Sequence, residues 1–356
     1  MDLKKREIQY DYLRTLAVFA IIMVHAIPSE TLNSRQWLFS AALMPVLLAF
    51  VGIFFMISGM FFLKTGTENI LLFYKKRFHS IVIPFVCYSG IYYWYYNVYL
   101  SQEKTGIFEH LSRFIKAFIT GTIPMAPHMW FMYVIISLYL CTPFLARMAN
   151  AMSDKDLKLF LVLMIFVQGM CTYLPSLGLE VGESFQYVIF KGWLIYFMLG
   201  YGWKRLYGGR SCLPFAVLGL AGFGVTMFQK IATPYFTPGI HDIAPSMMAM
   251  ALSIFVFFET FGNVKVPVLT RFAGFVSRYS YSIYLIHYLV LGQLARGLVE
   301  KTVIRHYYVP KIFCETAVTF LISLAAAWIL DSTVIKVLKR VSGRWFFGKK
   351  DRERRN

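Results

Sequence analysis

The apolar residues of this chain are gathered into blocks of about 18 to 25 residues, separated by short polar segments. A helix rises about 1.5 Å per residue, so each block is long enough to cross a hydrocarbon core about 30 Å thick. Lipid offers no hydrogen-bonding partner to the edge of an open sheet, so such blocks must be helical. The composition agrees, because 58% of the 356 residues are hydrophobic and only 15% are charged. The sequence therefore predicts an all-α integral membrane protein.

We expect about ten spans in one transmembrane domain over residues 1–340, followed by a basic cytoplasmic tail over 341–356. The expected spans are 11–29, 38–63, 78–100, 129–148, 157–175, 186–204, 212–231, 243–262, 274–298 and 309–335. Lys and Arg are retained on the cytoplasmic side of a membrane. Placing the N-terminus inside puts most of the 36 Lys and Arg residues on that side. We therefore expect both termini in the cytoplasm.

The connection 101–128 is the one long connection between the expected spans, and it is amphipathic. Its apolar face and its helix-breaking residues are His110, Leu111, Phe114, Ile115, Phe118, Pro124 and Pro127. An amphipathic helix beside a membrane lies in the interface with its apolar face in the head-group boundary. We expect this connection either to lie on the outer interface or to fold over the site as a lid.

The net charge of +18 is compatible with a nucleic-acid-binding protein, but the positions of the charges argue against one. The basic residues lie between apolar blocks, and the densest cluster follows the last block, where anionic lipid head groups are the expected partner. We therefore expect membrane lipids and no nucleic acid as partners. The five cysteines have no CxxC or metal-type spacing, so we expect no metal site. The sequence also lacks a GxSxG motif and a Gly-rich phosphate loop.

Arg14 and His25 are the most informative polar pair, because ionisable residues in a membrane helix need a partner or a function. Eleven residues at 100° each come within about 20° of three whole turns, so both side chains project from one helix face, about 16 Å apart. This arrangement would hold an anionic molecule at the guanidinium with its reactive end near the imidazole. Two simpler interpretations remain: Arg14 extends to the interface and pairs with Asp11, and His25 is a packing residue.

Three further runs carry polar residues near or inside expected spans. The run 54–59 (FFMISG) contains Ser58 beside Gly59, a pair that also serves close helix packing. Lys76 and Arg77 precede the third span, where they serve either as a phosphate clamp or as a simple topology signal. His287 lies within the ninth span, one turn after Tyr284, with few polar neighbours to satisfy it.

Taken in order, these runs resemble the membrane acyltransferase-3 family. Arg14 and His25 match its Arg-x10-His signature, and the run 54–59 matches its FFxxSG element. The other matches are Lys76-Arg77 before Pro84, Trp130-Phe131 with Pro143, and the run 284–287. The resemblance extends over nearly the whole chain in the family's order.

The resemblance implies about ten helices and the O-acylation, usually acetylation, of cell-envelope glycans at the inner membrane of a bacterium. The donor would be cytoplasmic acetyl-CoA, with succinyl or another short acyl group left open. His25 would be the catalytic imidazole, as general base or transient acyl carrier, and Arg14 would bind the donor or orient the site. The remaining implied binding residues are Arg77 and Lys76 for the CoA phosphates, and Ser58 and His287 in the same cavity.

Many relatives carry an additional extracytoplasmic hydrolase-like domain that completes the transfer. We find none in this sequence and expect the membrane domain to act directly on its acceptor, a glycan or its lipid-linked precursor.

A transporter or flippase of an envelope precursor is the alternative function, because multi-span proteins with intramembrane His and Arg are commonly transporters. The sequence shows no inverted repeat and no paired Gly- or Pro-broken helices in corresponding halves, which weakens that alternative. A membrane sensor without catalysis is a third interpretation.

Overall fold

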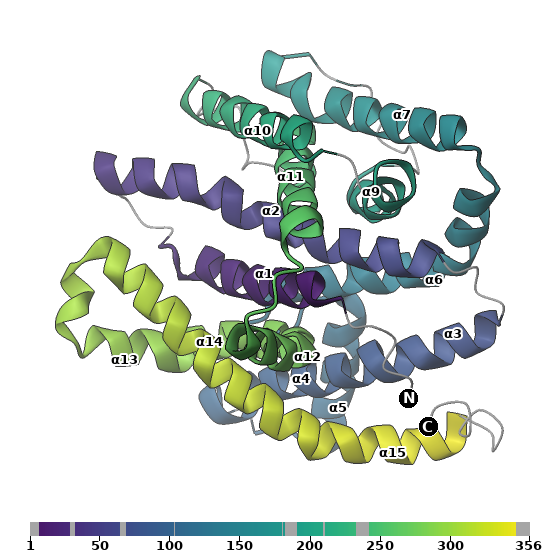
Figure 1. Ribbon diagram of the computed structural model, residues 1–356. Coiled ribbons are helices and arrows are strands. Elements are labelled where there is room, and N and C mark those ends of the chain that lie inside the picture. The colour runs from purple at the N-terminus through teal and green to yellow at the C-terminus, as the bar shows by residue number, and fades with distance from the viewer. Residues whose placement is uncertain are drawn as a thin grey trace. The chain divides into compact units, whose positions relative to one another are not determined.

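The computed structural model describes residues 7–28, 33–64, 69–102, 104–179, 181, 191–208, 211–232 and 242–346 (Figure 1). Every regular element within these residues is a helix. The chain divides into two compact units. The first unit contains the described residues of 67–140 and 275–356, and the second contains those of 7–66 and 141–274. The predicted all-α fold is confirmed for the described residues.

In the second unit the helices correspond to apolar blocks of the sequence. Most of these blocks end at or near a glycine, a proline or a basic residue. They are α1 (Ile8–Ala26), α2 (Ser34–Lys64), the end of α6 (Trp130–Ala151), α7 (Asp154–Tyr173), η4 (Pro175–Leu177), α9 (Trp193–Leu206), α10 (Leu213–Ala232), α11 (Pro245–Phe261) and the start of α12 (Pro267–Val290). The side chain of Ser153 caps α7 in a capping box with Asp156, and Pro245 occupies the first turn of α11.

The first unit contains the remaining helices. They are α3 (Ile70–Arg77), η1 (Phe78–Val82), α4 (Ile83–Trp94), η2 (Tyr95–Leu100), α5 (Ile107–Thr120), η3 (Pro127–Met129), the start of α6, the end of α12, η5 (Leu291–Ala295), α13 (Arg296–Glu300), η6 (Val303–His306), α14 (Tyr308–Ser332) and α15 (Val334–Phe346). Residues 70–100 form one continuous helical run in which π-turns alternate with α-turns. Pro84 lies in the first turn of α4 and has no N–H to donate, and a π-turn directly precedes it.

Six helical stretches among the described residues are long and apolar enough to cross a membrane, so the chain is a multi-pass membrane protein. They are Ser34–Lys64, Pro127–Ala151, Asp154–Tyr173, Leu213–Ile231, Pro267–Glu300 and Tyr308–Gly343. Each of the ten expected spans overlaps a described helix. The number ten, the cytoplasmic termini and the boundary at 340/341 stay predictions. The tail beyond Phe346 lies outside the described residues.

Close backbone contact joins α2 to α9 in the second unit. A Cβ atom on Gly59 would overlap the carbonyl oxygen of Phe197, and one on Gly200 would overlap that of Met56. Each helix therefore has a glycine at the point where the backbone of the other helix comes into contact. Small residues permit such close packing of helices in membranes. The packing interpretation of the run 54–59 is thus confirmed at Gly59.

Candidate functional site

Arg14 and His25 lie on α1, which is an unbroken α-helix from Ile8 to Ala26. The regular helix gives the two side chains the shared face and the spacing of about 16 Å expected from the sequence. Both side chains are half-buried, and the guanidinium carbon of Arg14 lies 5.8 Å from the ring centroid of Phe61 on α2. That distance permits a cation–π contact, so the Arg14 end of this helix face lies against α2.

An ion pair lies beside the start of α1. Lys204 Nζ on α9 is 2.8 Å from Glu259 Oε2 on α11, and it also donates to the hydroxyl of Tyr10 at 3.4 Å. Lys204 is thus the ion-pair partner of Glu259 in this structure. Only 9% of the Glu259 side chain is exposed, so this pair is better sheltered than a surface salt bridge.

Ser58 is half-buried on α2, one residue before the glycine that contacts α9. It belongs to the second unit, with Arg14 and His25. Its expected place in the binding cavity stays a prediction.

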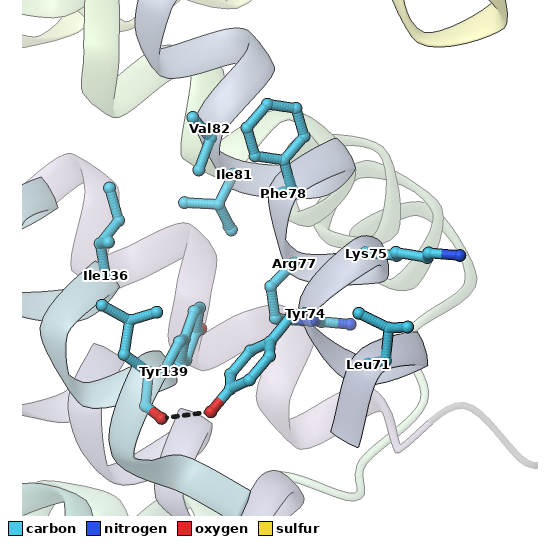
Figure 2. Close-up of a pocket in the computed structure, with 10 residues that line it drawn as sticks. Leu71, Tyr74, Lys75, Arg77, Phe78, Ile81, Val82, Ile136 and Tyr139 are labelled. Atoms are coloured by element: carbon cyan, nitrogen blue, oxygen red, sulfur yellow. Dashed lines mark hydrogen bonds between the residues drawn. The ribbon is translucent and has the colours of Figure 1, made fainter. Parts of the chain in front are cut away.

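In the first unit Arg77 lines a pocket of about 340 Å³ between the α3–η1 run and α6 (Figure 2). The lining residues are Leu71, Tyr74, Lys75, Arg77, Phe78, Ile81, Val82, Ile136, Tyr139 and Leu140. The guanidinium carbon of Arg77 lies 5.6 Å from the ring centroid of Phe73 and 5.9 Å from that of Tyr139. The hydroxyl of Tyr74 donates to the carbonyl oxygen of Leu140 at 2.7 Å and ties α3 to α6.

The wall of this pocket is almost entirely apolar and aromatic. Figure 2 shows the Lys75 ammonium pointing away from Ile136 and Tyr139 on the opposite wall. Lys76 is exposed and does not line the pocket, so of the two expected phosphate-binding residues only Arg77 does. The guanidinium of Arg77 lies against the rings of Phe73 and Tyr139, a stacking arrangement that suits a planar guanidinium. This arrangement suits an apolar ligand or the apolar part of a larger one.

His287 lies at the end of α12 and is fully buried against a second imidazole that the sequence analysis did not select. The ring centroids of His128 and His287 are 4.8 Å apart, in an edge-to-face arrangement. His128 stacks on Tyr288, and its backbone carbonyl accepts a hydrogen bond from the hydroxyl of Tyr284. His287 thus has polar neighbours, contrary to the expectation, and the carbonyl oxygen of Tyr284 is one of them.

A half-buried carboxylate, Asp331, also lies in the first unit and was not predicted from the sequence. Both carboxylate oxygens of Asp331 accept from the hydroxyl of Ser282, at 2.9 and 2.8 Å, and the hydroxyl of Tyr88 donates to one of them at 3.4 Å. Three helices, α4, α12 and α14, therefore meet at one acidic side chain. The sequence does contain a signal for this site, because Asp331 is an acidic residue inside the last expected span.

The described residues hold no group of three or more His, Cys, Asp or Glu side chains that could bind a metal ion. All five cysteines are free; Cys141 is exposed and the other four are half-buried.

These features define a helical, multi-pass membrane protein with histidines and a half-buried carboxylate on its apolar helices and an apolar pocket beside Arg77. The chain belongs to the acyltransferase-3 family, since the family model for this acyltransferase domain matches residues 7–331. The match includes α1 and reaches the end of α14, so Arg14, His25, Arg77 and Asp331 all fall within it. Comparisons with curated proteins and with solved structures gave no match.

Proposed function

We propose that this membrane acyltransferase moves an acetyl or similar short acyl group from cytoplasmic acetyl-CoA to a hydroxyl of a cell-envelope glycan or its lipid-linked precursor. It would do so in the inner membrane of a bacterium, with both termini cytoplasmic. The family supports acyl transfer, and the charge distribution supports the orientation.

The site assignment depends on one observation: α1 is a regular helix, so Arg14 and His25 share one of its faces about 16 Å apart. CoA has anionic phosphates at one end and a thioester at the end of an extended pantetheine arm. A fixed cation and a titratable imidazole at such a separation match both ends of that donor. Arg14 would hold or orient the donor. His25 would act beside the reacting carbonyl, as general base or as transient acyl carrier.

The reaction transfers one acyl group without a redox step. The acceptor hydroxyl oxygen forms a bond to the acyl carbon, and the bond from that carbon to the CoA sulfur breaks. His25 takes the hydroxyl proton as a general base, and the thiolate leaves and is protonated to free CoA. A base with a pKa near neutrality typically accelerates such a step by about 10² to 10⁴. If His25 instead carries the acyl group, the same bonds form and break in two steps.

Arg77 offers a second contact for the donor's phosphates, because a guanidinium binds phosphate through two parallel hydrogen bonds. The apolar wall of the pocket, including Phe78 and Ile136, would contact uncharged parts of the donor. Lys76 would contribute charge from outside the pocket, while Ser58 and His287 stay proposed cavity residues.

The test is acetyl-CoA-dependent esterification of envelope glycan in membranes that contain either the natural protein or the His25→Ala variant. Mass spectrometry of the glycan should show an acetyl mass shift that alkali removes. His306→Ala is a matched control, because His306 is an exposed histidine on η6. We expect the control to keep full activity and His25→Ala to lose it.

Two results would contradict the proposal in different ways. Full activity of His25→Ala would remove the assigned role of that residue while leaving the reaction in place. Failure of membranes with the natural protein to bind labelled acetyl-CoA, or another short acyl-CoA, would remove the reaction itself.

A further inference from the structure

The position of α5 relative to α4 is set by aromatic contacts at both ends of α5. Near its start, His110 packs on Trp94 with ring centroids 5.2 Å apart. Near its end, Phe118 packs on Phe85 at 4.8 Å, and the hydroxyl of Tyr133 donates to the carbonyl oxygen of Phe118. As α5 proceeds from residue 110 to 118, its contacts move backwards along α4 from residue 94 to 85.

These contacts make α5 run antiparallel to α4. Eight residues separate the contacts on α5 and nine separate them on α4, which corresponds to about 12 to 14 Å along each axis. Two helices that cross at right angles would touch over about one turn of each. A helix lying flat on the membrane surface would cross α4 in that way.

The depth of this contact follows from α12, which runs beside α4. The hydroxyl of Tyr281 donates to the carbonyl oxygen of Ile81, and the N–H of Leu289 donates to the hydroxyl of Tyr92. Residues 85–94 of α4 therefore lie level with residues 284–292 of the apolar stretch Pro267–Glu300. The centre of that stretch is near residue 283, so the Phe118 end of α5 lies nearer to it than the His110 end does.

The chain reverses after α5 and returns toward the interface. Gly121 adopts a left-handed conformation with φ of 72°, and the N–H of Thr122 donates to the carbonyl oxygen of Ala117 to close the helix end. Helix α5 thus ends at Thr120, with Gly121 as its cap, before the prolines expected to break it. The return brings Met129 to Ser89, one turn above the Phe85 level, where the hydroxyl of Ser89 lies 3.4 Å from the Met129 sulfur.

Two unlike faces of α5 stay exposed. One is an apolar stripe formed by Ile107, Phe108, Leu111, Ile115 and Ile119, with Phe108 85% and Ile119 72% exposed. The other is charged and formed by Glu109, Arg113 and Lys116, in which Glu109 and Arg113 form an ion pair at 2.5 Å. Apolar side chains at membrane depth face lipid, whereas charged side chains at that depth face water or a partner.

We propose that residues 107–129 form a re-entrant hairpin, and not a surface helix or a lid. Its apolar stripe lies against lipid acyl chains, and its charged face lines a water-filled crevice that reaches toward the middle of the membrane. Irregular backbone such as the turn at Gly121 is tolerated at membrane depth where it lines such a crevice. The hairpin also carries His128 to its position against His287.

The test measures depth along the apolar stripe by electron paramagnetic resonance in lipid nanodiscs. A nitroxide amino acid replaces Phe108, Leu111, Ile115 or Ile119 in turn, which leaves the five native cysteines in place. Contact with dissolved oxygen, relative to contact with a water-soluble nickel complex, should rise steadily from 108 to 119. Because 11 residues separate these positions, the difference in depth should approach 16 Å, or about 1.5 Å per residue. Equal depth at the four positions would overturn the hairpin.

A second measurement uses the unaltered protein and tests the crevice. Sealed vesicles are treated with a membrane-impermeant amine reagent, and modified lysines are identified by mass spectrometry. Lys104, in the exposed connection before α5, is the internal control. We expect Lys116 to be modified from the same side as Lys104. Modification of Lys104 without Lys116 would overturn the water-filled crevice, and neither measurement depends on acyl transfer.

Discussion

The imidazoles of His128 and His287 lie with ring centroids 4.8 Å apart, and each ring uses one nitrogen on a backbone carbonyl of α12. His287 Nδ1 is 2.6 Å from the carbonyl oxygen of Tyr284, and His128 Nε2 is 3.2 Å from that of Leu285. A carbonyl oxygen only accepts, so in both rings that nitrogen carries the proton. In a neutral imidazole the other nitrogen carries a lone pair, so this arrangement allows two roles, a packing contact and a proton acceptor.

A matched pair of variants separates these two roles at position 287. His287→Asn can still donate from its amide nitrogen to the carbonyl of Tyr284, whereas His287→Leu cannot. We expect His287→Asn to unfold at nearly the natural temperature and His287→Leu to lose about 0.5 to 1.5 kcal/mol with the hydrogen bond of the imidazole. If the ring acts as a base, both variants lose acyl transfer by about 10² or more. Retained activity in His287→Asn would leave the ring a purely structural role.

Gly59→Ala should be among the most damaging conservative substitutions in the chain. The added methyl group would overlap the carbonyl oxygen of Phe197, which as backbone cannot rotate away. We expect loss of about 3 kcal/mol or more, or failure to accumulate folded protein in the membrane. The matched control is Gly90→Ala on α4, where no atom lies within 4 Å of an added Cβ. Equal stability of the two variants, measured by thermal unfolding in detergent, would contradict the close contact of α2 with α9.

Arg77→Leu should raise the KM for acyl-CoA with little change in kcat. The substitution removes the guanidinium and keeps an apolar side chain against Phe73 and Tyr139. Loss of a charge-assisted hydrogen bond of about 1.5 to 3 kcal/mol corresponds to a KM increase of about 10-fold to 150-fold. Lys76→Leu is the control on the same helix, and because Lys76 is exposed we expect less than about 3-fold. Similar KM values for both variants would place the donor elsewhere.

Asp331→Leu should destabilise the first unit more than Asp331→Asn does. Asparagine still offers an oxygen to the hydroxyls of Ser282 and Tyr88, whereas leucine leaves both buried donors unsatisfied. Each unsatisfied donor costs about 1 to 3 kcal/mol. The measurement is the midpoint of thermal unfolding in the same detergent for both variants. A higher midpoint for Asp331→Leu would show that these hydrogen bonds do not stabilise the fold.

Asp242 precedes α11, and burial raises the pKa of its carboxyl from 3.8 to about 6. The folded protein therefore retains this proton more strongly than the unfolded chain does. The stabilisation by the neutral form is fully present below about pH 3.8 and is lost as the pH rises through about 6. Above that pH the penalty amounts to about 3 kcal/mol at most.

Asp242→Asn should therefore raise the unfolding temperature at pH 7.5, with a gain that fades toward pH 4. Asp154→Asn is the control, because Asp154 is an exposed partner of Arg205 and its removal offers no such gain. A gain for Asp242→Asn that is equal at both pH values would show that burial of the charge is not its cause.

Much of the fold was predictable, because block length and hydropathy are properties of the chain alone. The α1 stripe was predictable for the same reason, since the phase between Arg14 and His25 depends only on helix geometry. His128 and Asp331 were not selected because their importance depends on neighbours from distant segments. The sequence places His128 at the start of a span, but only packing brings it to His287, 159 positions later. Helix α5 was recognised as amphipathic, yet its depth depends on ring contacts with α4.

The contact of Gly59 with Phe197 and of Gly200 with Met56 also bears on how this sequence can change over evolution. At each of the two glycines, the backbone of the opposite helix occupies the space of a side chain. A larger residue at one position would force the helices apart. The other position would then no longer require glycine. Drift at these two positions should therefore be coupled. Relatives that have lost one glycine are expected to have lost both and to hold α2 and α9 together through interlocking side chains.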